Sequence, residues 1–386
     1  MFRERLRRLA DQSLLRRLRP LESATGPTVS LDGRTVILLA SNDYLGLASH
    51  PAVVRAAVDA TERYGTGAGA SRLVCGTLPP HRELESTLAQ FKHTEAALTF
   101  GSGYLANLGL IPALTGRGGL ILADRLSHAS LIDGARLSGA DFRVFRHRDL
   151  NHLESLLTRR TAKGPTLILT DGLFSMDGDL APLPELIGLA ERFEAILYVD
   201  DAHGTGVMGP TGRGSAEHFG VATRLPFHMG TLGKALGSSG AYVAADADTV
   251  AYFLNTCRPF LFTTAPPPGA VAAARAALDV IDREPERRER LWRNRTHLHT
   301  GLVKLGFRLT DTVSPILPVL IGTADDTLAF ADQLLANDVF APAIRPPTVP
   351  DDSSRIRVTV TAEHTPEQID RALAAFERAG RARHLI

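Results

Sequence analysis

The stretch TLGKALGSSGAYV, Thr231–Val243, is the point from which the rest of the sequence is best interpreted. It places one lysine, Lys234, among small residues, and an apolar strand-like run, Ala241–Ala245, overlaps its end. Glycines let the backbone approach a bulky group closely and adopt angles that other residues avoid. A lysine on such a loop can hold a phosphate or bond to a carbonyl cofactor, and it can equally be a solvated loop residue. The rest of the sequence is needed to distinguish these interpretations of Lys234.

The composition describes a globular chain without a global charge. The 386 residues include 43 Lys and Arg against 42 Asp and Glu, and 44% are apolar. This length predicts two domains plus a terminal arm. A net charge of +1 supplies no field for nucleic acid or an anionic membrane. No apolar run reaches the ~18 residues of a membrane span, and two cysteines without metal spacing suit a reducing compartment. We therefore expect a cytoplasmic protein with no nucleic-acid partner and no membrane partner.

The start of the chain is strongly basic. Its first nineteen residues hold seven arginines, and five leucines form the apolar side of a helix expected over residues 1–23 and ending at Pro20. This start lacks the apolar segment of a secretory signal. A hairpin with Asp32–Gly33 as its turn is expected over residues 27–40. We expect residues 1–41 to form an N-terminal arm of helix and hairpin.

Short apolar runs alternate with helical stretches in the middle of the chain. Strands are expected at 97–100, 120–123, 142–145, 167–170, 196–199, 227–229 and 241–245, and helices at 51–64, 80–92, 103–115, 128–138, 149–160 and 182–194. Apolar strands that alternate with helices predict an α/β fold, with a mostly parallel seven-stranded sheet buried between helices. Ligands of such a sheet bind beyond the carboxyl ends of the strands.

The last third of the chain predicts a second, smaller domain. A long helix is expected over residues 266–304, strands near 316–321 and 356–361, and helices near 327–337 and at 366–382. We expect a large domain over residues 42–280 and a smaller α+β C-terminal domain over residues 281–386.

Polar residues gather at the expected carboxyl ends of the strands. A glycine-rich turn, Gly101–Asn107, opens a helix and resembles an anion site. His128 follows the second strand, and Asp200 and His203 follow the fifth. No further His or Cys stands at metal-ligand spacing, so we expect no metal. Pyridoxal phosphate needs this set: a lysine for its aldehyde (Lys234), an acid at its ring nitrogen, a ring to stack on, a donor to its phenolic oxygen and an anion site.

Other nucleotide and nucleophile motifs fit less well. A phosphate-binding loop of the GxxxxGK[ST] type has a different spacing from Gly230–Lys234, and Ala235 replaces its metal-binding hydroxyl. A dinucleotide motif would follow a strand, whereas Gly65–Gly67 follows an expected helix. No GxSxG nucleophile turn follows an expected strand.

Longer motifs resemble the α-oxoamine synthases, a family of fold-type I pyridoxal-phosphate transferases. They are SNDYLGL, GTGAGASRLVCGTLPPHRELE, DRLSHASLIDG, FSMDGDLAPL, VDDAHGTGVMG, TLGKALGSSG and RPFLFTTAPP, in order from about residue 40 onward. DGLFSMDGDLAPL, IRPPTVP and RIRVTVTAEHT resemble the branch of the family that condenses L-alanine with a pimeloyl thioester in biotin biosynthesis. The resemblance implies an acyltransferase that is a homodimer.

The resemblance also implies a role for each matching residue. Lys234 matches the Schiff-base lysine, Asp200 the aspartate at the ring nitrogen, and His203 the donor to the phenolic oxygen. His128 matches the stacking histidine, and with Lys234 and Asp200 it makes up the expected catalytic set. The other implied cofactor contacts are Gly103, Tyr104, Ser175, Thr231 and Thr263, the last reaching the phosphate from the neighbouring subunit. The implied substrate contacts are Arg357 for the amino-acid carboxylate, Asn42, and Arg16 for the acyl group, with Arg17 or Arg19 as alternatives to Arg16.

Three questions stay open at this point. The same chemistry with glycine or serine and another acyl-CoA, as in 2-amino-3-ketobutyrate CoA ligase or 5-aminolevulinate synthase, is the alternative substrate choice. A catalytically silent subunit or a nucleotide-binding scaffold is the alternative from another class. The acyl donor is either a CoA thioester or an acyl carrier protein, and an acidic carrier could meet the basic start of the chain.

Overall fold

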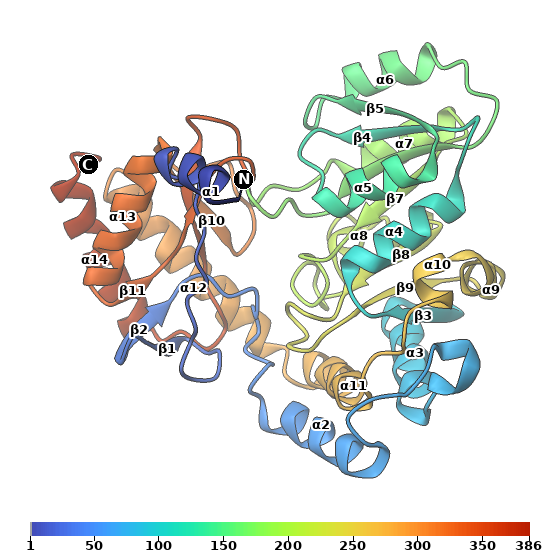
Figure 1. Ribbon diagram of the computed structural model, residues 1–386, viewed down its shortest axis with the longest axis horizontal. Helices are drawn as coiled ribbons and strands as arrows, with labels where there is room; N and C mark the ends of the chain where they lie inside the picture. Colours follow the sequence, from blue (N-terminus) through green and yellow to red (C-terminus); the bar gives the residue numbers. More distant parts are fainter. Residues whose placement is uncertain (1) are drawn as a thin grey trace. The chain divides into compact units, whose positions relative to one another are not determined.

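The protein is described by a computed structural model over residues 2–386, which form two compact units (Figure 1). The first unit contains the chain up to Ser49 together with Ser175–Asp179 and Glu286–Ile386, and the second contains His50–Phe174 and Leu180–Pro285. Apart from the segment Ser175–Asp179, the chain passes from the first unit to the second after Ser49 and returns to the first after Pro285. The expected domain limits at residues 41 and 280 stay a prediction.

The second unit is organised around a seven-stranded sheet with the strand order β3-β9-β8-β7-β6-β4-β5. Its strands are β3 (Ala96–Phe100), β4 (Leu120–Asp124), β5 (Asp141–Phe145), β6 (Thr166–Asp171), β7 (Ile196–Asp200), β8 (Phe227–Thr231) and β9 (Ala241–Ala245). The pairs from β5 to β8 are parallel, and β9 runs antiparallel to both β3 and β8. The predicted α/β fold with a mostly parallel seven-stranded sheet is confirmed.

Helices lie between most of these strands, as the alternation of the sequence predicts (Figure 1). The helices of this unit are α2 (Pro51–Tyr64), α3 (Pro79–Lys92), α4 (Gly103–Leu114), α5 (Ala129–Ser138), α6 (Leu150–Thr158), α7 (Leu183–Arg192), α8 (Ser215–His218), α9 (Ala247–Thr256), α10 (Arg258–Leu261) and α11 (Pro268–Arg283). A π-helical turn, Arg72–Gly76, lies in the glycine-dense loop between α2 and α3, and a 3-10 turn, Ala222–Arg224, precedes β8. The glycine-rich turn after β3 becomes the start of α4, which positions the site described below.

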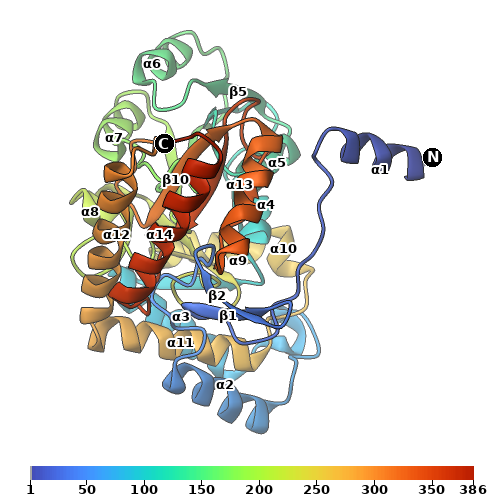
Figure 2. The same cartoon turned by 90° about the vertical axis from the view of Figure 1, so that its left-hand side faces the viewer.

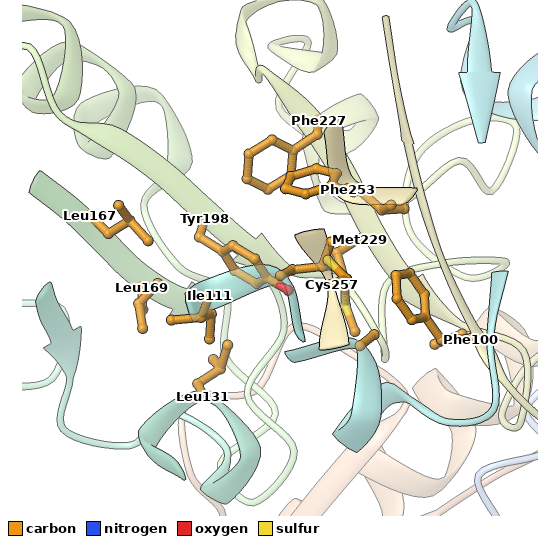
Figure 3. Close-up of a cluster of buried hydrophobic side chains, with 14 of the residues drawn as sticks. Phe100, Ile111, Leu131, Leu167, Leu169, Tyr198, Phe227, Met229, Phe253 and Cys257 are labelled. Carbon is orange, nitrogen blue, oxygen red and sulfur yellow. The ribbon is translucent and has the colours of Figure 1, made fainter. Parts of the chain in front are cut away.

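Both faces of the sheet are buried, which explains the continuous apolar strands. Successive side chains of a strand point to opposite faces. Leu167 and Leu169 of β6 join one apolar cluster, whereas Ile168 between them joins the other. Figure 3 shows the first cluster, in which Leu131 of α5 lies below Leu167 and Leu169 and Phe253 of α9 lies beside Phe227. Helices therefore cover both faces of the sheet, which leaves the ends of the strands for a ligand.

The first unit holds two small sheets and most of the C-terminal helices. One sheet has the order β1-β2-β11 and the other β10-β13-β12. Their strands are β1 (Thr28–Leu31), β2 (Arg34–Leu38), β10 (Ile316–Gly322), β11 (Val339–Phe340), β12 (Ala343–Ile344) and β13 (Ser354–Thr359), and the helices are α1 (Phe2–Asp11), α12 (Glu286–Lys304), α13 (Ala324–Ala336) and α14 (Pro366–Ala382). The predicted hairpin is confirmed, and β11 extends it in parallel through the pair Val339–Ile37.

The first helix is shorter than predicted. We expected it over residues 1–23, but α1 ends at Asp11, and Figure 2 shows it at the end of the segment that leads to β1. Ser13 takes a left-handed φ of 57°, which ends a right-handed helix. The segment that follows is bound elsewhere, because Arg345 donates to Ser13 O. No residue of α1 is buried.

The long helix expected over residues 266–304 is two helices. α11 ends at Arg283 and α12 begins at Glu286. Pro285 lies between them, and a proline disfavours helical angles at the residue before it, here Glu284 with a ψ of 61°. No helix within residues 2–386 is long and apolar enough to cross a membrane.

Candidate active site

The carboxyl ends of β6, β7 and β8 bring the predicted cofactor residues of the second unit to one edge of its sheet. Asp171 ends β6, Asp200 ends β7 and Thr231 ends β8. Parallel pairing sets Asp171 opposite Asp200. Lys234 follows β8 in a half-buried loop, and its Nζ lies 3.4 Å from Thr231 Oγ1. The lysine therefore lies where a parallel sheet binds its ligands.

Glycines shape the loop of Lys234, as its sequence suggested. Gly237 N donates to Lys234 O at 2.9 Å, and Leu232 N donates to Gly240 O at 2.9 Å. Gly237 and Gly240 have φ values of 60° and 110°, which side chains with a Cβ rarely adopt. A Cβ on Gly240 would also lie 2.8 Å from Phe100 O. These positions require glycine to close the loop against β3.

The turn before α4 fits a phosphate group. A Cβ on Gly103 would lie 2.6 Å from Thr231 Cγ2, so only glycine lets the start of α4 approach the end of β8 so closely. Ser102 caps this helix by accepting from Leu105 N at 3.2 Å. Backbone N–H groups at a helix N-terminus bind phosphate. Gly103 and Thr231, both expected as cofactor contacts, are thus in contact with each other beside Lys234.

Asp200 is buried, and both of its carboxylate oxygens accept hydrogen bonds. Oδ2 accepts from Asn107 Nδ2 at 2.7 Å, and Oδ1 accepts from the backbone N–H of Ala202 at 3.0 Å. Asn107 is fully buried in α4, and its Oδ1 accepts from the Tyr198 hydroxyl at 2.6 Å. Two N–H donors on one buried carboxyl suit a carboxylate, which can hold a proton on the nitrogen of a bound heterocycle.

His128 caps α5 and is joined to Asp200 by hydrogen bonds. Its Nδ1 accepts from Ser130 N at 3.3 Å and lies 2.7 Å from Ser130 Oγ. Ser130 Oγ in turn accepts from Asn107 Nδ2 at 2.8 Å. Burial lowers the pKa of His128, and the charges of Asp200 and Lys234 act on it in opposite directions. The expected acid, stacking ring and lysine of the cofactor site are therefore within electrostatic reach of one another.

Asp171 is a second buried acid at this edge. Its Oδ2 accepts from the backbone N–H of His128 at 2.9 Å. Burial raises the pKa of Asp171 well above its ordinary value, and the charge of Asp200 raises it further. Asp171 therefore keeps its proton to a higher pH than an ordinary aspartate, and its bond to His128 holds the start of α5 against the end of β6.

The other expected cofactor residues occupy three further places in this unit. Tyr104 lies edge-on to His128, with 6.4 Å between ring centroids, and its hydroxyl donates to Asp133. His203 is buried in the loop after β7. Thr263 is half-buried after α10, beside the bridge between Ser71 and Thr264, and its role toward a neighbouring subunit stays a prediction.

A buried polar network begins at Asp201, next to Asp200. Asp201 accepts from both the hydroxyl and the backbone N–H of Ser215. Burial raises the pKa of Asp201 to about 6, and the charge of Lys92 opposes this shift. Lys92 donates to Arg213 O and lies 5.7 Å from the centre of the Tyr242 ring. This network holds the loop that carries His203.

The Asp201 carboxyl predicts a pH dependence of stability. Because the folded pKa of about 6 exceeds the ordinary 3.8, the folded state binds more protons in this range, so the free energy of unfolding falls as pH rises from 4 to 6. The fall amounts to about 3 kcal/mol. Urea unfolding of full-length protein at several pH values should show it, and Asp201→Asn should flatten the curve. Asp59→Asn, on the exposed side of α2, is the matched control. Equal slopes in the wild type and Asp201→Asn would contradict this assignment.

The first unit holds the residues expected for the substrate carboxylate. Arg357 of β13 is buried, and its Nε donates to Ser175 O. Its Nη2 donates to Asn42 Oδ1 at 3.1 Å and lies 3.5 Å from the hydroxyl of the fully buried Tyr44. Asn42 and Arg357 therefore meet within this unit together with Ser175, which was expected as a cofactor contact, and these contacts orient one guanidinium.

The N-terminal arginines lie in the same unit. Arg16 Nη2 donates to Pro346 O at 3.3 Å, so Arg16 contacts the IRPPTVP segment. Arg19 pairs with Asp332 of α13 at 3.7 Å. The arm is thus attached to the C-terminal part of its unit, and the choice of Arg16 over Arg17 or Arg19 for the acyl group stays a prediction.

The residues that sequence reasoning missed are Asn107, Ser130, Tyr198 and Tyr44. Asn107 had one usable signal, since it lies four residues after Gly103 and therefore on the same face of α4 as the start of the helix. An asparagine within an apolar helix needs a buried partner. Tyr44 had no such signal, because its partner Arg357 is more than three hundred residues away.

Comparison with known proteins finds relatives along nearly the whole chain. The sequence profile of the aminotransferase class I and II family matches residues 34–376. An 8-amino-7-oxononanoate synthase of Geobacter sulfurreducens is 52% identical over 379 residues, which cover 97% of each protein. A solved serine palmitoyltransferase from S. paucimobilis, holding a pyridoxal phosphate–myriocin aldimine, has a TM-score of 0.95 and 34% identity, and covers 100% of this chain and 98% of its own. A solved 8-amino-7-oxononanoate synthase from Francisella tularensis has a TM-score of 0.78 and 28% identity over 90% of this chain and 99% of its own.

Fold and relatives together define a fold-type I pyridoxal-phosphate transferase. The chain belongs to the aminotransferase class I and II family and, within it, to the family of the 8-amino-7-oxononanoate synthases. Pyridoxal phosphate is its cofactor. The residues fit that cofactor, because four features meet at one edge of the sheet. They are an amine that can bond to the aldehyde, a carboxylate, an imidazole ring and a glycine turn, supplied by Lys234, Asp200, His128 and Gly103.

Proposed function

We propose that this enzyme condenses L-alanine with a pimeloyl thioester to 8-amino-7-oxononanoate in biotin biosynthesis. A carbon–carbon bond forms between Cα of alanine and the thioester carbonyl, while the alanine carboxylate leaves as CO₂ and the thiol is released. The observation that carries the chemistry is the meeting of Lys234, Asp200 and His128 at one edge of the sheet. The substrate choice is supported by relatives of that name at 46–52% identity along the chain.

Each residue then has a defined task. When bound, pyridoxal phosphate supplies an electron sink for the bonds that break at Cα. Lys234 would hold the cofactor covalently, and its amine, once released, would take and return the Cα proton. Asp200 would keep the proton on the ring nitrogen, and His128 would cover one face of the ring. His203 would donate to the phenolic oxygen. The backbone N–H groups at the start of α4 and Thr231 would hold the phosphate, with Ser175, Tyr104 and Thr263 as further cofactor contacts.

Arg357 binds the carboxylate of the amino-acid substrate, with Asn42 beside it. A planar guanidinium can meet a carboxylate with two parallel N–H bonds, which an ammonium cannot. We expect Arg357→Lys to raise KM for L-alanine by about 30-fold, since two charge-assisted bonds become one at a loss of ~2 kcal/mol, with a smaller change in kcat. Steady-state kinetics at saturating thioester measure this. Arg355→Lys is the matched control on the same strand, because Arg355 binds Asp177 instead. Equal KM values for both variants would remove Arg357 from the substrate site.

The partners of the proposed enzyme follow from its family and charge. We infer a homodimer, in which Thr263 serves the phosphate of the other subunit. The acyl group is delivered by CoA or by an acyl carrier protein, and Arg16 is the arginine that we propose for its contact. Five exposed or half-buried charges of the arm, Arg3, Arg5, Arg7, Arg8 and Arg16, suit an acidic carrier. The free thiols of Cys75 and Cys257 suit the cytoplasm.

A second substrate choice is supported by one observation. The solved serine palmitoyltransferase matches the fold at a TM-score of 0.95, above the 0.78 of the solved 8-amino-7-oxononanoate synthase. Serine with a long acyl thioester is therefore the alternative that this match supports. Sequence identity favours alanine and pimelate, at 52% against 34%.

A substrate panel distinguishes these choices. The purified holoenzyme is given L-alanine, glycine or L-serine with pimeloyl-, acetyl-, succinyl- or palmitoyl-CoA, and thiol release is measured. We expect kcat/KM for alanine with pimeloyl-CoA to exceed every other pair by at least tenfold. A higher value for serine with palmitoyl-CoA would replace the proposed function by the alternative. If no CoA thioester supports turnover, pimeloyl carrier protein is the decisive donor.

A further inference from the structure

A polar chain runs through the apolar core from Asp200 to His128, and its hydrogen-bond directions can be assigned. Asn107 is the central member, with no exposed surface and three partners. Tyr198 donates to Asn107 Oδ1, since burial raises the pKa of Tyr198 well above its ordinary value and keeps it a phenol. Asp200 offers only acceptors as a carboxylate. The Asn107 amide must therefore point its NH₂ group at Asp200 and Ser130, because the flipped amide would set oxygen against oxygen.

The direction continues through Ser130 to His128. Because Ser130 Oγ accepts from Asn107 Nδ2, its own proton is available for His128 Nδ1 at 2.7 Å. The backbone N–H of Ser130 donates to the same nitrogen at 3.3 Å, in the manner of a helix cap. A ring nitrogen that accepts from two donors carries no proton of its own. A neutral His128 with this arrangement has its proton on Nε2.

We propose that Asn107 and Ser130 are positioning residues. Their hydrogen bonds connect Asp200 to His128, fix the orientation of the His128 imidazole and keep it neutral with its proton on Nε2. The state of the His128 ring does not depend on the proposed function. Only its expected effect on turnover rests on that function. A neutral ring can cover the cofactor without a second positive charge beside the protonated ring nitrogen. Its Nε2–H can donate to an oxygen of a bound substrate, and Nε2 cannot accept a proton there.

On balance the surroundings of His128 also favour a neutral ring. Burial lowers the pKa of His128, and Lys234 lowers it, whereas Asp200 and Asp133 raise it, with a lowered pKa as the net result. Asp171 contacts His128 through the backbone N–H only, and Tyr104 lies edge-on to the ring. The N-terminus of α5, which His128 caps, also disfavours a positive charge at this position.

The state of the ring can be measured directly by NMR of the full-length protein with ¹⁵N-labelled histidine, without and with cofactor. Comparison with His128→Gln assigns the signals of one histidine among thirteen. We expect the Nδ1 signal of an unprotonated acceptor and the Nε2 signal of a protonated nitrogen near neutral pH. A proton on Nδ1, or on both nitrogens, would overturn the proposal. Once the signals are assigned, the measurement is made on the wild-type chain and does not depend on the substrate.

Variants of Ser130 test the transmission. Ser130→Ala removes the hydroxyl donor, and Ser130→Thr keeps it. Ser127→Ala is the matched control, because Ser127 Oγ is buried next to His128 without a hydrogen-bond partner among residues 2–386. We expect Ser130→Ala to populate a second form of the His128 ring and to lower kcat/KM about tenfold, as for the loss of one ~1.4 kcal/mol hydrogen bond, with both effects reversed in Ser130→Thr and absent in Ser127→Ala.

An unchanged ring signal and a kcat/KM within twofold of wild type in Ser130→Ala would refute the role of Ser130. If Ser130→Ala does not fold, the wild-type ring state still decides between the two outcomes. Absence of the predicted product in the substrate panel would refute the proposed function alone, because the ring state is measured without substrate.

Discussion

Lys234→Ala is expected to abolish turnover while the protein still folds and binds pyridoxal phosphate. Lys234 is half-buried, and its Nζ lies 3.4 Å from Thr231 Oγ1 at the edge where the cofactor residues meet. Loss of the amine removes both the covalent attachment and the group that moves the Cα proton. Proton transfer by a positioned group contributes ~10²–10⁴-fold, so we expect kcat to fall by at least about 10³-fold. The phosphate cradle at Gly103 and Thr231 is untouched, so cofactor should remain bound.

The chain offers a simple control for this variant. It contains four lysines, and Lys163 is exposed on a loop between α6 and β6. Borohydride treatment of the holoenzyme followed by peptide mapping should find the cofactor fixed on Lys234 in both the wild type and Lys163→Ala, and on no lysine in Lys234→Ala. Turnover in Lys234→Ala within tenfold of wild type would exclude the lysine from the chemistry.

Asp200→Asn is expected to have the second largest effect. The carboxylate is needed to keep a proton on the ring nitrogen, and electrostatic groups of this kind contribute ~10²–10³-fold. The amide also fits the structure badly, because Oδ2 accepts from Asn107 and Oδ1 from Ala202 N–H. An asparagine can accept only one of these bonds and points its own donors at the other. We expect kcat to fall by about 10²-fold or more and the free energy of unfolding by ~1–3 kcal/mol.

The measurements that separate these two effects are kcat, urea unfolding and the absorption spectrum of the bound cofactor, which senses the proton on the ring nitrogen. Asp141→Asn is the matched control, because Asp141 is exposed at the start of β5. A variant of Asp200 that loses stability but keeps the spectrum and more than half of kcat would show that Asp200 is structural.

The large sheet and its ligand edge were predictable because their signals are local. Most of the strands are short apolar runs that lead into an acid or a glycine, as Leu167–Thr170 of β6 leads into Asp171. Lys234, Asp200 and His128 follow such runs, and the carboxyl ends of parallel strands share one edge, so these residues are expected to lie together. The lengths of the helices were less predictable. Ser13 ends α1 through its backbone angle, and Pro285 divides the helix expected over residues 266–304.

The polar chain behind the site was not predictable, because it depends on which way each side chain points as well as on the residue type. Asn107 lies in an apolar helix, where its type indicates a buried partner but does not identify it, and Tyr198 lies in an apolar strand, where it looks like an ordinary core residue. Their meeting with Asp200 depends on the packing of α4 against β7. The same holds for Tyr44, whose partner Arg357 follows after most of the chain.

The most direct test of the proposed reaction follows carbon through it. Holoenzyme is incubated with pimeloyl-CoA and L-alanine labelled with ¹³C either in the carboxylate or at Cα. We expect the carboxylate label to appear only as ¹³CO₂, equal in amount to the thiol released, and the Cα label to appear only in the amine-bearing carbon of 8-amino-7-oxononanoate. Thiol release with the carboxylate label retained in the product, or no carbon–carbon bond between the two substrates, would contradict the decarboxylative condensation at Lys234.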